Sequence, residues 1–327
     1  MKILFFILGL VTVLSCSKND ADIENQTDEW SVDVSDITGK LNLFPLIENP
    51  EFSSVKDTRL DGNQLVGIVN FGSQIRVYPY AHTNPFEVVN DVSNGQKFAF
   101  SYCPITKSAI AFRRKSIFRA SGLLYKNNVT PWEKDTETIW SQMLVKGING
   151  PNINRRFNTI PVVETTWSTV KDFLPNAKVM SLPDGFLFPD FVSSKTPDEP
   201  SDEESSENIP NSGEFTYGIL TSQAVHIFRY NDFMNSKRRD VTIQSDKYLV
   251  YGNSGKRVIS AFKVSSFDSY QLLEDDKFPD IFRDNSGVVY NFLGQGSNGS
   301  NLEKPEVAYV AIWKAWQDIF SSFKYQE

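Results

Sequence analysis

Cysteine and histidine are almost absent from this chain, which has two of each among 327 residues. Cys16 lies in an N-terminal leader pattern, so Cys103 would be the one thiol left in the mature protein, and one cysteine cannot close an intramolecular disulfide. The apolar core alone must then stabilise the fold. A zinc site needs three or four ligands, and the sequence offers only His82, Cys103 and carboxylates such as Glu87 or Asp91. We therefore predict no metal site.

An excess of positive charge is also lacking. The chain has 33 Lys and Arg against 40 Asp and Glu, a net charge of −7. No basic stripe of the kind that binds nucleic acid is present. Much of the acidity lies in residues 193–214, which contain prolines and few apolar side chains. Such a segment cannot bury enough surface to offset its ordering entropy, so we predict a disordered linker or loop there.

The N-terminus has the pattern of a bacterial lipoprotein. A charged start at residues 1–2 precedes an apolar run over residues 3–13 that is too short for a transmembrane helix. The run leads into Leu-Ser-Cys at Cys16, which resembles the lipoprotein box whose cysteine is acylated, with palmitate among the chains. We expect residues 1–16 to be a signal peptide with Cys16 as a stable lipid anchor. Residues 17–29 then read as a flexible tether.

This anchor would attach the folded part to the bacterial cell envelope, with the outer membrane favoured, facing either the periplasm or the cell surface. The expected partners are the membrane and an unknown small molecule or envelope protein. Nothing in the sequence indicates nucleic acid, and nothing identifies a cofactor.

Abundant aromatic residues and few helix-periodic runs favour a β-rich chain. Residues 64–70 and 74–80 form a plausible hairpin around a Gly-containing turn. A short helix is expected next, because Asn84 is a good N-cap, Pro85 suits the first helical position and Glu87 completes a capping box. That helix would run to about Asp91.

Two further helices are expected. Thr165 or Thr166 can cap a helix over residues 167–174, which Pro175 would stop. Near the C-terminus, apolar side chains at helical spacing predict a closing helix that packs on the core. Those side chains are Ile312, Trp316, Ile319 and Phe323.

The chain after the acidic segment resembles a degenerate copy of the chain before Cys103. Residues 217–220 and 225–230 can be aligned with residues 66–69 and 75–80, and both stretches continue into two further apolar runs. Gly252-Asn253-Ser254-Gly255 then takes the place of the cysteine turn. The alternative is that any two β-hairpins look alike in composition.

We predict a β-rich α+β fold in which two similar hairpin-based units form one interlocked body with short helices and a C-terminal helix. The first unit spans residues 30–192 and carries the cysteine turn. The second, degenerate unit spans residues 215–327.

Cys103 is the main candidate for reactivity. Pro104 follows it and cannot donate to a central ladder, so Cys103 should lie at a strand end or turn. A thiol is activated beside Lys, His or a helix N-terminus, and Lys107 or His82 could be that neighbour. The alternative is a small buried hydrophobe, as most free cysteines are.

Seven short segments point to a family. They are Val77-Tyr78-Pro79-Tyr80, Glu87-Val88-Val89-Asn90-Asp91, Ser101-Tyr102-Cys103-Pro104, Ser121-Gly122-Leu123-Leu124-Tyr125, Trp140-Ser141-Gln142, Thr165-Thr166-Trp167 and the region of Trp313. In this order they resemble an uncharacterised prokaryotic family, the domain of unknown function numbered three-one-seven-nine. The resemblance covers about residue 47 to the C-terminus and implies no established reaction.

The chain departs from that family at two places. Many members resemble Tyr-Cys-Pro-Leu-Cys-Gly at the cysteine turn, whereas Thr106 and Lys107 replace the second Cys and the Gly here. A dithiol site is thereby excluded. Members also commonly have Trp-His-Glu where this chain has Pro85, Phe86 and Glu87, and His82 could only partly substitute for the missing imidazole.

These patterns leave several hypotheses. The favoured one is an envelope lipoprotein that binds a small molecule or a partner in a polar pocket around Cys103. The candidate binding residues are Glu87, Asn90, Tyr102, Ser121, Tyr125, Trp140, Gln142 and Thr166. The same clusters also fit the satisfied hydrogen bonds of a β-rich core, and a helix cap explains Glu87. The alternative is a thiol-dependent enzyme with Cys103 as nucleophile and Asp91 or His82 as its proton partner. A third hypothesis is a scaffold component of an envelope complex.

Overall fold

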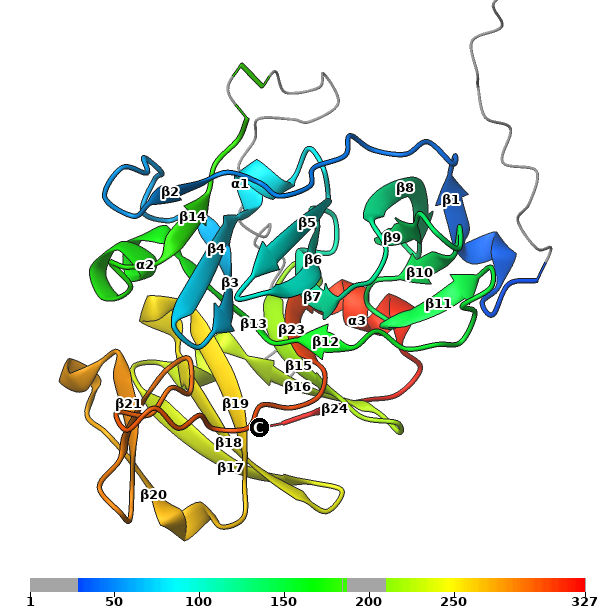
Figure 1. The fold of residues 1–327 in the computed structure, drawn as a ribbon. Helices are drawn as coiled ribbons and strands as arrows, with labels where there is room; N and C mark the ends of the chain where they lie inside the picture. Colours follow the sequence, from blue (N-terminus) through cyan, green and yellow to red (C-terminus); the bar gives the residue numbers. More distant parts are fainter. Residues whose placement is uncertain (1–28, 184, 187–209, 327) are drawn as a thin grey trace, which may run out of the picture.

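The computed structural model describes residues 29–183, 185–186 and 210–326 (Figure 1). This part of the chain contains six β-sheets and three short α-helices. The expectation of a β-rich α+β fold is therefore confirmed. The expected signal peptide with Cys16, nearly all of the tether and most of the acidic segment lie outside the described residues. No helix within the described ranges is both long and apolar enough to cross a bilayer.

Three sheets come from the first half of the chain. Sheet I has the order β13-β3-β4-β14-β2, sheet II the order β12-β7-β6-β5 and sheet III the order β1-β8-β9-β10-β11. Their strands are β1 Ile37–Gly39, β2 Phe52–Ser54, β3 Leu65–Phe71, β4 Gln74–Pro79, β5 Val88–Ser93, β6 Gln96–Cys103, β7 Ser108–Arg113, β8 Phe118–Tyr125, β9 Asn128–Glu133, β10 Ile139–Ser141, β11 Lys146–Asn149, β12 Thr159–Ile160, β13 Val162–Thr166 and β14 Lys178–Met180.

Three sheets come from the second half. Sheet IV has the order β23-β15-β16-β24, sheet V the order β17-β18-β19 and sheet VI the order β20-β21-β22. Their strands are β15 Phe215–Leu220, β16 Val225–Arg229, β17 Lys237–Ile243, β18 Asp246–Asn253, β19 Val258–Val264, β20 Tyr270–Leu272, β21 Asp280–Asp284, β22 Val289–Asn291, β23 Ala308–Ile312 and β24 Phe323–Tyr325.

The helices are short. The α-helices are α1 Tyr80–Thr83, α2 Trp167–Phe173 and α3 Trp313–Ile319, and the 3-10 helices are η1 Val34–Asp36, η2 Tyr230–Phe233, η3 Ser254–Lys256, η4 Phe267–Ser269 and η5 Asp275–Lys277. Thr166 caps α2 as expected, because its side chain accepts a hydrogen bond from the Thr169 N–H. The closing helix α3 is also present, but it ends at Ile319, and Phe323 lies in β24.

The predicted helix from Asn84 to Asp91 is wrong. Helix α1 starts earlier, and Asn84 is its C-cap rather than an N-cap. The following residues form strand β5, which pairs with β6 from Val88 to Ser93. Glu87 has a left-handed φ of 54° between the two elements. The local capping pattern was overridden because a β-branched, half-apolar run gains more from pairing inside a buried sheet.

The strand pairing of β5, β6 and β7 recurs in β17, β18 and β19 at a spacing of 150 residues. Val88 pairs with Ser101 as Arg238 pairs with Tyr251. The pair of Cys103 with Ser108 likewise corresponds to that of Asn253 with Val258.

The edges of sheets I and IV also match. Strand β13 is antiparallel to β3 and leads through α2 into β14, which is parallel to β4. Strand β23 is antiparallel to β15 and leads through α3 into β24, which is parallel to β16. One detail of the sequence alignment is corrected: Tyr217, not Gly218, corresponds to Gly67, because Tyr217 pairs with Phe228 as Gly67 pairs with Tyr78.

Four apolar clusters join the layers. One lies between sheets I and II, and one between sheets IV and V. The other two join the halves: α3 and β16 pack against sheets II and III, while α2 and sheet I pack against sheets V and VI. In Figure 1 the red α3 accordingly lies among the strands of the first half.

Gly67 is required by close packing inside the first of these clusters. An alanine Cβ there would lie 2.6 Å from Cζ of Phe100, whose ring is buried and stacked on Tyr78 with centroids 4.3 Å apart. We expect Gly67→Ala to lower the free energy of unfolding by about 1–3 kcal/mol through overpacking. Gly62→Ala is the control, because its Cβ would meet Ser168 at an ordinary 3.6 Å. Urea unfolding of both variants measures the change in the free energy of unfolding. Equal stabilities of Gly67→Ala and Gly62→Ala would contradict the packing argument.

Candidate functional site

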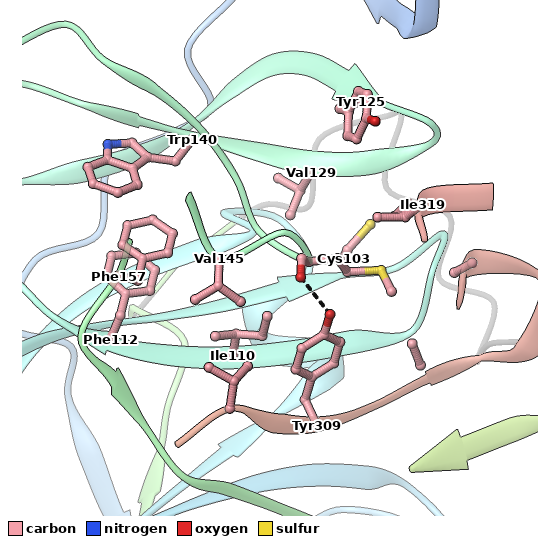
Figure 2. Close-up of a cluster of buried hydrophobic side chains, with 14 of the residues drawn as sticks. Cys103, Ile110, Phe112, Tyr125, Val129, Trp140, Val145, Phe157, Tyr309 and Ile319 are labelled. Atoms are coloured by element: carbon pink, nitrogen blue, oxygen red, sulfur yellow. Dashed lines mark hydrogen bonds between the residues drawn. The ribbon is translucent and has the colours of Figure 1, made fainter. Parts of the chain in front are cut away.

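Cys103 ends β6, as the sequence predicted, but it does not lie at the mouth of a cleft. Its side chain has no exposed surface and belongs to the apolar cluster that joins the halves. Figure 2 shows it beside Val129 and Tyr309. Its Sγ lies 3.7 Å from the backbone oxygen of Asn127. Burial, followed by the charge of Glu87, raises the pKa of the thiol. This environment favours a packed thiol over a thiolate.

The polar groups around the cysteine turn satisfy one another. The Gln142 side-chain oxygen accepts hydrogen bonds from Ser108 Oγ at 2.6 Å and Asn128 Nδ2 at 2.8 Å. The Gln142 Nε2 donates to the Ser101 carbonyl and hydroxyl oxygens, both at 3.0 Å. A buried network with its bonds made is rigid and gives a ligand little to bind. The Gln142 side chain therefore makes its hydrogen bonds within the fold.

The two proposed proton partners of Cys103 lie elsewhere. Asp91 accepts a hydrogen bond from the Tyr78 hydroxyl at 2.6 Å, and burial raises its pKa. It pairs with Phe98, five residues before Cys103 on β6, and five residues of strand span about 16 Å. His82 Nδ1 is 2.8 Å from the backbone oxygen of Met180, and burial lowers its pKa. Both side chains are therefore engaged with other groups of the fold.

Two of the candidate binding residues make hydrogen bonds within the fold. Asn90 donates from Nδ2 to the backbone oxygens of Ile47 and Phe118, and its Oδ1 accepts the Phe118 N–H at 2.9 Å. The Ser121 hydroxyl bonds the Thr130 hydroxyl within sheet III. Their polar groups are used within the fold.

The remaining three candidates are also explained by the fold. Tyr125 ends β8, where it pairs with Ile37. The Trp140 ring stacks on Phe157 with centroids 4.2 Å apart. Thr166 caps α2. The Trp140 ring is thus packed and the Gln142 amide is hydrogen-bonded within the fold, while Trp140 Nε1 is buried without a hydrogen bond to a described residue.

Glu87 is a buried acidic residue. Its side chain is 8% exposed, and its backbone N–H and C=O are held by Thr83 and Tyr102. Burial raises the pKa of its carboxyl to about 8. It therefore carries a proton at neutral pH and lies close enough to Cys103 to influence the thiol electrostatically.

The opposite face of β6 differs from the cysteine face. Side chains alternate along a strand, so Tyr102 points away from the layer that holds Cys103. Its ring stacks on Tyr80 with centroids 4.0 Å apart. Tyr80 donates from its hydroxyl to Glu164 Oε2 at 3.0 Å. Glu164 lies on β13 and is 3% exposed, and burial raises its pKa.

Arg257 completes this group from the second half of the chain. It follows η3 in a left-handed conformation with φ 54°. Its guanidinium carbon lies 4.3 Å from the ring centroids of both Phe215 and Tyr230. Its Nε is 3.6 Å from Glu164 Oε1, which is beyond hydrogen-bond distance. We call Tyr80, Tyr102, Glu164, Tyr230 and Arg257 the arginine–tyrosine cluster.

Several polar atoms of this cluster have no hydrogen-bond partner in the part of the chain that the structure describes. They are the hydroxyls of Tyr102 and Tyr230, Glu164 Oε1, and Arg257 Nε and Nη2. All five atoms are buried. An unpaired buried polar group costs roughly 1–3 kcal/mol, so this arrangement is suited to a guest that supplies the missing partners.

Another arginine shows what the unused edge of Arg257 can do. Arg229 uses the same two atoms, Nε and Nη2, to bind Glu214 with both carboxylate oxygens at 2.7 and 2.8 Å. This pair also places the last residue of the expected acidic linker within the fold. A guanidinium edge of this kind recognises carboxylate and phosphate groups. Within the described residues, no group of three or more His, Cys, Asp or Glu side chains is arranged to hold a metal ion.

Sequence reasoning identified Tyr102 but missed Glu164, Tyr230 and Arg257. A glutamate inside the apolar run of residues 160–167 was one available signal, because an ionisable residue in a buried strand needs a specific partner. Arg257 lies in the turn that had been interpreted only as a lost copy of the cysteine turn. The distance along the chain from Glu164 to Arg257 hid their contact.

Comparison with known protein families matches residues 42–322 to the family described as protein of unknown function, DUF3179. The chain belongs to this family. The match confirms the resemblance that the seven ordered segments indicated. No curated protein and no solved structure matches the chain. The DUF3179 membership covers both halves of the fold and the whole arginine–tyrosine cluster, and it assigns no reaction to either.

The raised pKa of Glu87 makes stability depend on pH. Its folded-state pKa of about 8 exceeds the ordinary value of 4.5, so between these values the folded state holds a proton that the unfolded state has lost. Stability then falls as pH rises through this window, by as much as about 5 kcal/mol at about 1.4 kcal/mol per pH unit. We expect Glu87→Gln to remove this loss.

Urea unfolding at a series of pH values from 5 to 8 measures the effect. The Glu87→Gln variant should match the unmodified protein near pH 5 and exceed its stability near pH 8. Glu306→Gln, at an exposed position, is the control and should follow the unmodified protein throughout. Parallel curves for Glu87→Gln and the unmodified protein would show that Glu87 is ionised in the folded state.

Proposed function

We propose that this DUF3179 protein is a lipid-anchored envelope protein that binds a small carboxylate or similar oxyanion at the arginine–tyrosine cluster. The observation that carries the proposal is the Nε and Nη2 edge of Arg257, which faces Glu164 at 3.6 Å yet makes no hydrogen bond to a described residue. The buried hydroxyls of Tyr102 and Tyr230 lie close to Glu164 as well. An oxyanion accepts from all of these donors at once. Small-molecule sites typically fix orientation with a few such convergent polar groups.

The proposed location in the cell envelope is inferred from the sequence. The apolar run before Cys16, too short to span a bilayer, supports acylation at that residue. A folded domain placed after a short polar tether would then present its site to the aqueous side of the membrane.

We also propose that the body consists of two interlocked copies of one unit. The spacing of 150 between the strand pairs of β3 to β7 and those of β15 to β19 supports duplication over the hairpins of sheets I and II and of sheets IV and V. The apolar clusters that cross between the halves support interlocking. In this arrangement the two turns that follow β6 and β18 are equivalent, and Lys107 and Arg257 both adopt left-handed φ values, of 52° and 54°.

Titration with acetate, pyruvate and succinate tests the ligand proposal. We expect at least one to bind below about 10 mM by calorimetry, since weak sites have Kd values near 1 mM. Arg257→Gln should weaken binding about tenfold or more, because a charged hydrogen bond contributes roughly 1.5–3 kcal/mol. Arg283→Gln, an exposed arginine outside the cluster, should bind as the unmodified protein does.

The double variant Arg257→Gln with Glu164→Gln separates binding from folding. It removes both buried charges, so it should fold while still failing to bind. If none of the three acids binds, or if Arg257→Gln binds them as tightly as the unmodified protein, the carboxylate site is disproved.

A thiol-dependent enzyme is the alternative, and burial together with the charge of Glu87, which raise the pKa of the Cys103 thiol, argues against it. The zero exposure of Cys103 opposes it. We expect iodoacetamide to modify Cys103 at least about a hundredfold more slowly in the folded protein than in urea, because a buried thiol with a raised pKa presents little thiolate. Mass spectrometry of protein beginning at Ser17 measures this. Rapid labelling below pH 8 would restore the enzyme hypothesis.

A further inference from the structure

A surface groove lies apart from the arginine–tyrosine cluster. It runs between α2 and the loop that connects β2 to β3, and its volume is about 700 Å³. That volume falls within the range of small-molecule sites, about 300–1,000 Å³. The groove shares no lining residue with the cluster, so any ligand here would be additional to the proposed oxyanion.

Hydrogen bonds fix both walls of the groove. The Thr58 hydroxyl donates to the Ser54 backbone oxygen at 2.8 Å, which shapes the loop. The Trp167 N–H donates to the Gln64 backbone oxygen at 2.8 Å, which ties the loop to the start of α2. Because the walls are built before any ligand arrives, little conformational entropy is lost on binding.

The lining is positively charged. Lys56, Arg59 and Lys171 face one acidic residue, Asp61, which leaves a charge of +2 in a chain whose net charge is −7. The Arg59 guanidinium donates through Nη1 to the Lys56 backbone oxygen at 2.7 Å, so this cation is held in place. A local positive groove on an acidic protein attracts anionic ligands.

The groove also contains an acceptor that an anion alone would leave unpaired. Gln64 lines the groove and is half-exposed, but its Oε1 has almost no accessible surface and receives no hydrogen bond from a described residue. A ligand reaches this acceptor when the Gln64 side chain rotates. A hydroxyl group is the natural donor at this position. Leu60 and Trp167 add apolar lining, against which the C–H groups of a sugar ring can pack.

We propose that this groove binds an acidic carbohydrate, whose anionic group pairs with Lys56 and Lys171 while a ring hydroxyl donates to Gln64. The three parts of the lining match the three chemical features of such a ligand. Free acidic sugars and acidic sugars within an envelope polymer share this chemistry.

Titration followed by calorimetry or NMR tests the proposal with glucuronate, glucose and inorganic phosphate. We expect glucuronate to bind more tightly than glucose or phosphate, because only glucuronate supplies both the charge and the hydroxyls. Lys56→Gln with Lys171→Gln should weaken glucuronate binding at least fivefold and leave glucose unaffected. Gln64→Leu should weaken glucuronate and glucose but not phosphate.

Lys178→Gln is the matched control, because this exposed lysine on β14 does not line the groove. A glucuronate oligosaccharide that binds more tightly than the monomer would identify a polymer as the source, whereas equal affinity would identify the free sugar. Equal binding of phosphate and glucuronate, with no effect of Gln64→Leu, would reduce the groove to a simple anion site and overturn the proposal. Failure of glucuronate to bind would overturn it as well.

Discussion

The alternation of side chains along β6 is the constraint on which both faces of the candidate site depend. Pairing with β5 and β7 fixes the register of this strand. Ser101 and Cys103 then point into a layer where Gln142 and its neighbours complete their hydrogen bonds. Tyr102, between them, points to the layer of Tyr80 and Glu164, where polar atoms stay unpaired. A register shift of one residue would exchange these faces, so the strand pairing decides where ligand chemistry is available.

Packing between the halves places the second-half residues of the cluster. Trp167 and Val170 of α2 bury their side chains with Leu249 and Phe262 of sheet V, and Trp316 of α3 is buried in the cluster that holds Cys103. Burial of apolar area contributes about 25 cal/mol per Å². Each half therefore depends on the other to cover its helix-bearing sheet. The Thr165 hydroxyl also donates to the Lys256 backbone oxygen at 2.7 Å, which sets the turn of Arg257 directly against β13.

Much of the local structure could be predicted from the sequence, because it depends on neighbouring residues. The hairpin of β3 and β4, the Thr166 cap and the turn at Cys103 follow from turn chemistry and apolar patterns. The helix from Asn84 could not be excluded locally, since its capping pattern is sound and only pairing with β6 reveals the competing strand. The candidate site was harder to predict than the local structure. Cys103 was the main candidate because cysteine is rare in this chain. The groups without full hydrogen bonding include a glutamate and an arginine 93 residues apart, and their contact arises only through the packing of the halves.

The separation of Glu164 and Arg257 gives the cluster its chemical character. With Glu164 ionised, the two charges balance, but a distance of 3.6 Å leaves the guanidinium edge without a hydrogen bond. Burial raises the pKa of Glu164. Whenever Glu164 is protonated, the half-buried Arg257 guanidinium, with its side chain 24% exposed, is a cation between two aromatic rings without a counter-charge on Glu164. Buried charge is costly unless it is paired. A bound oxyanion removes this cost in the second state and would be repelled by Glu164 in the first. The proposed anion binding would therefore be linked to proton uptake by Glu164, since each would stabilise the state that the other requires.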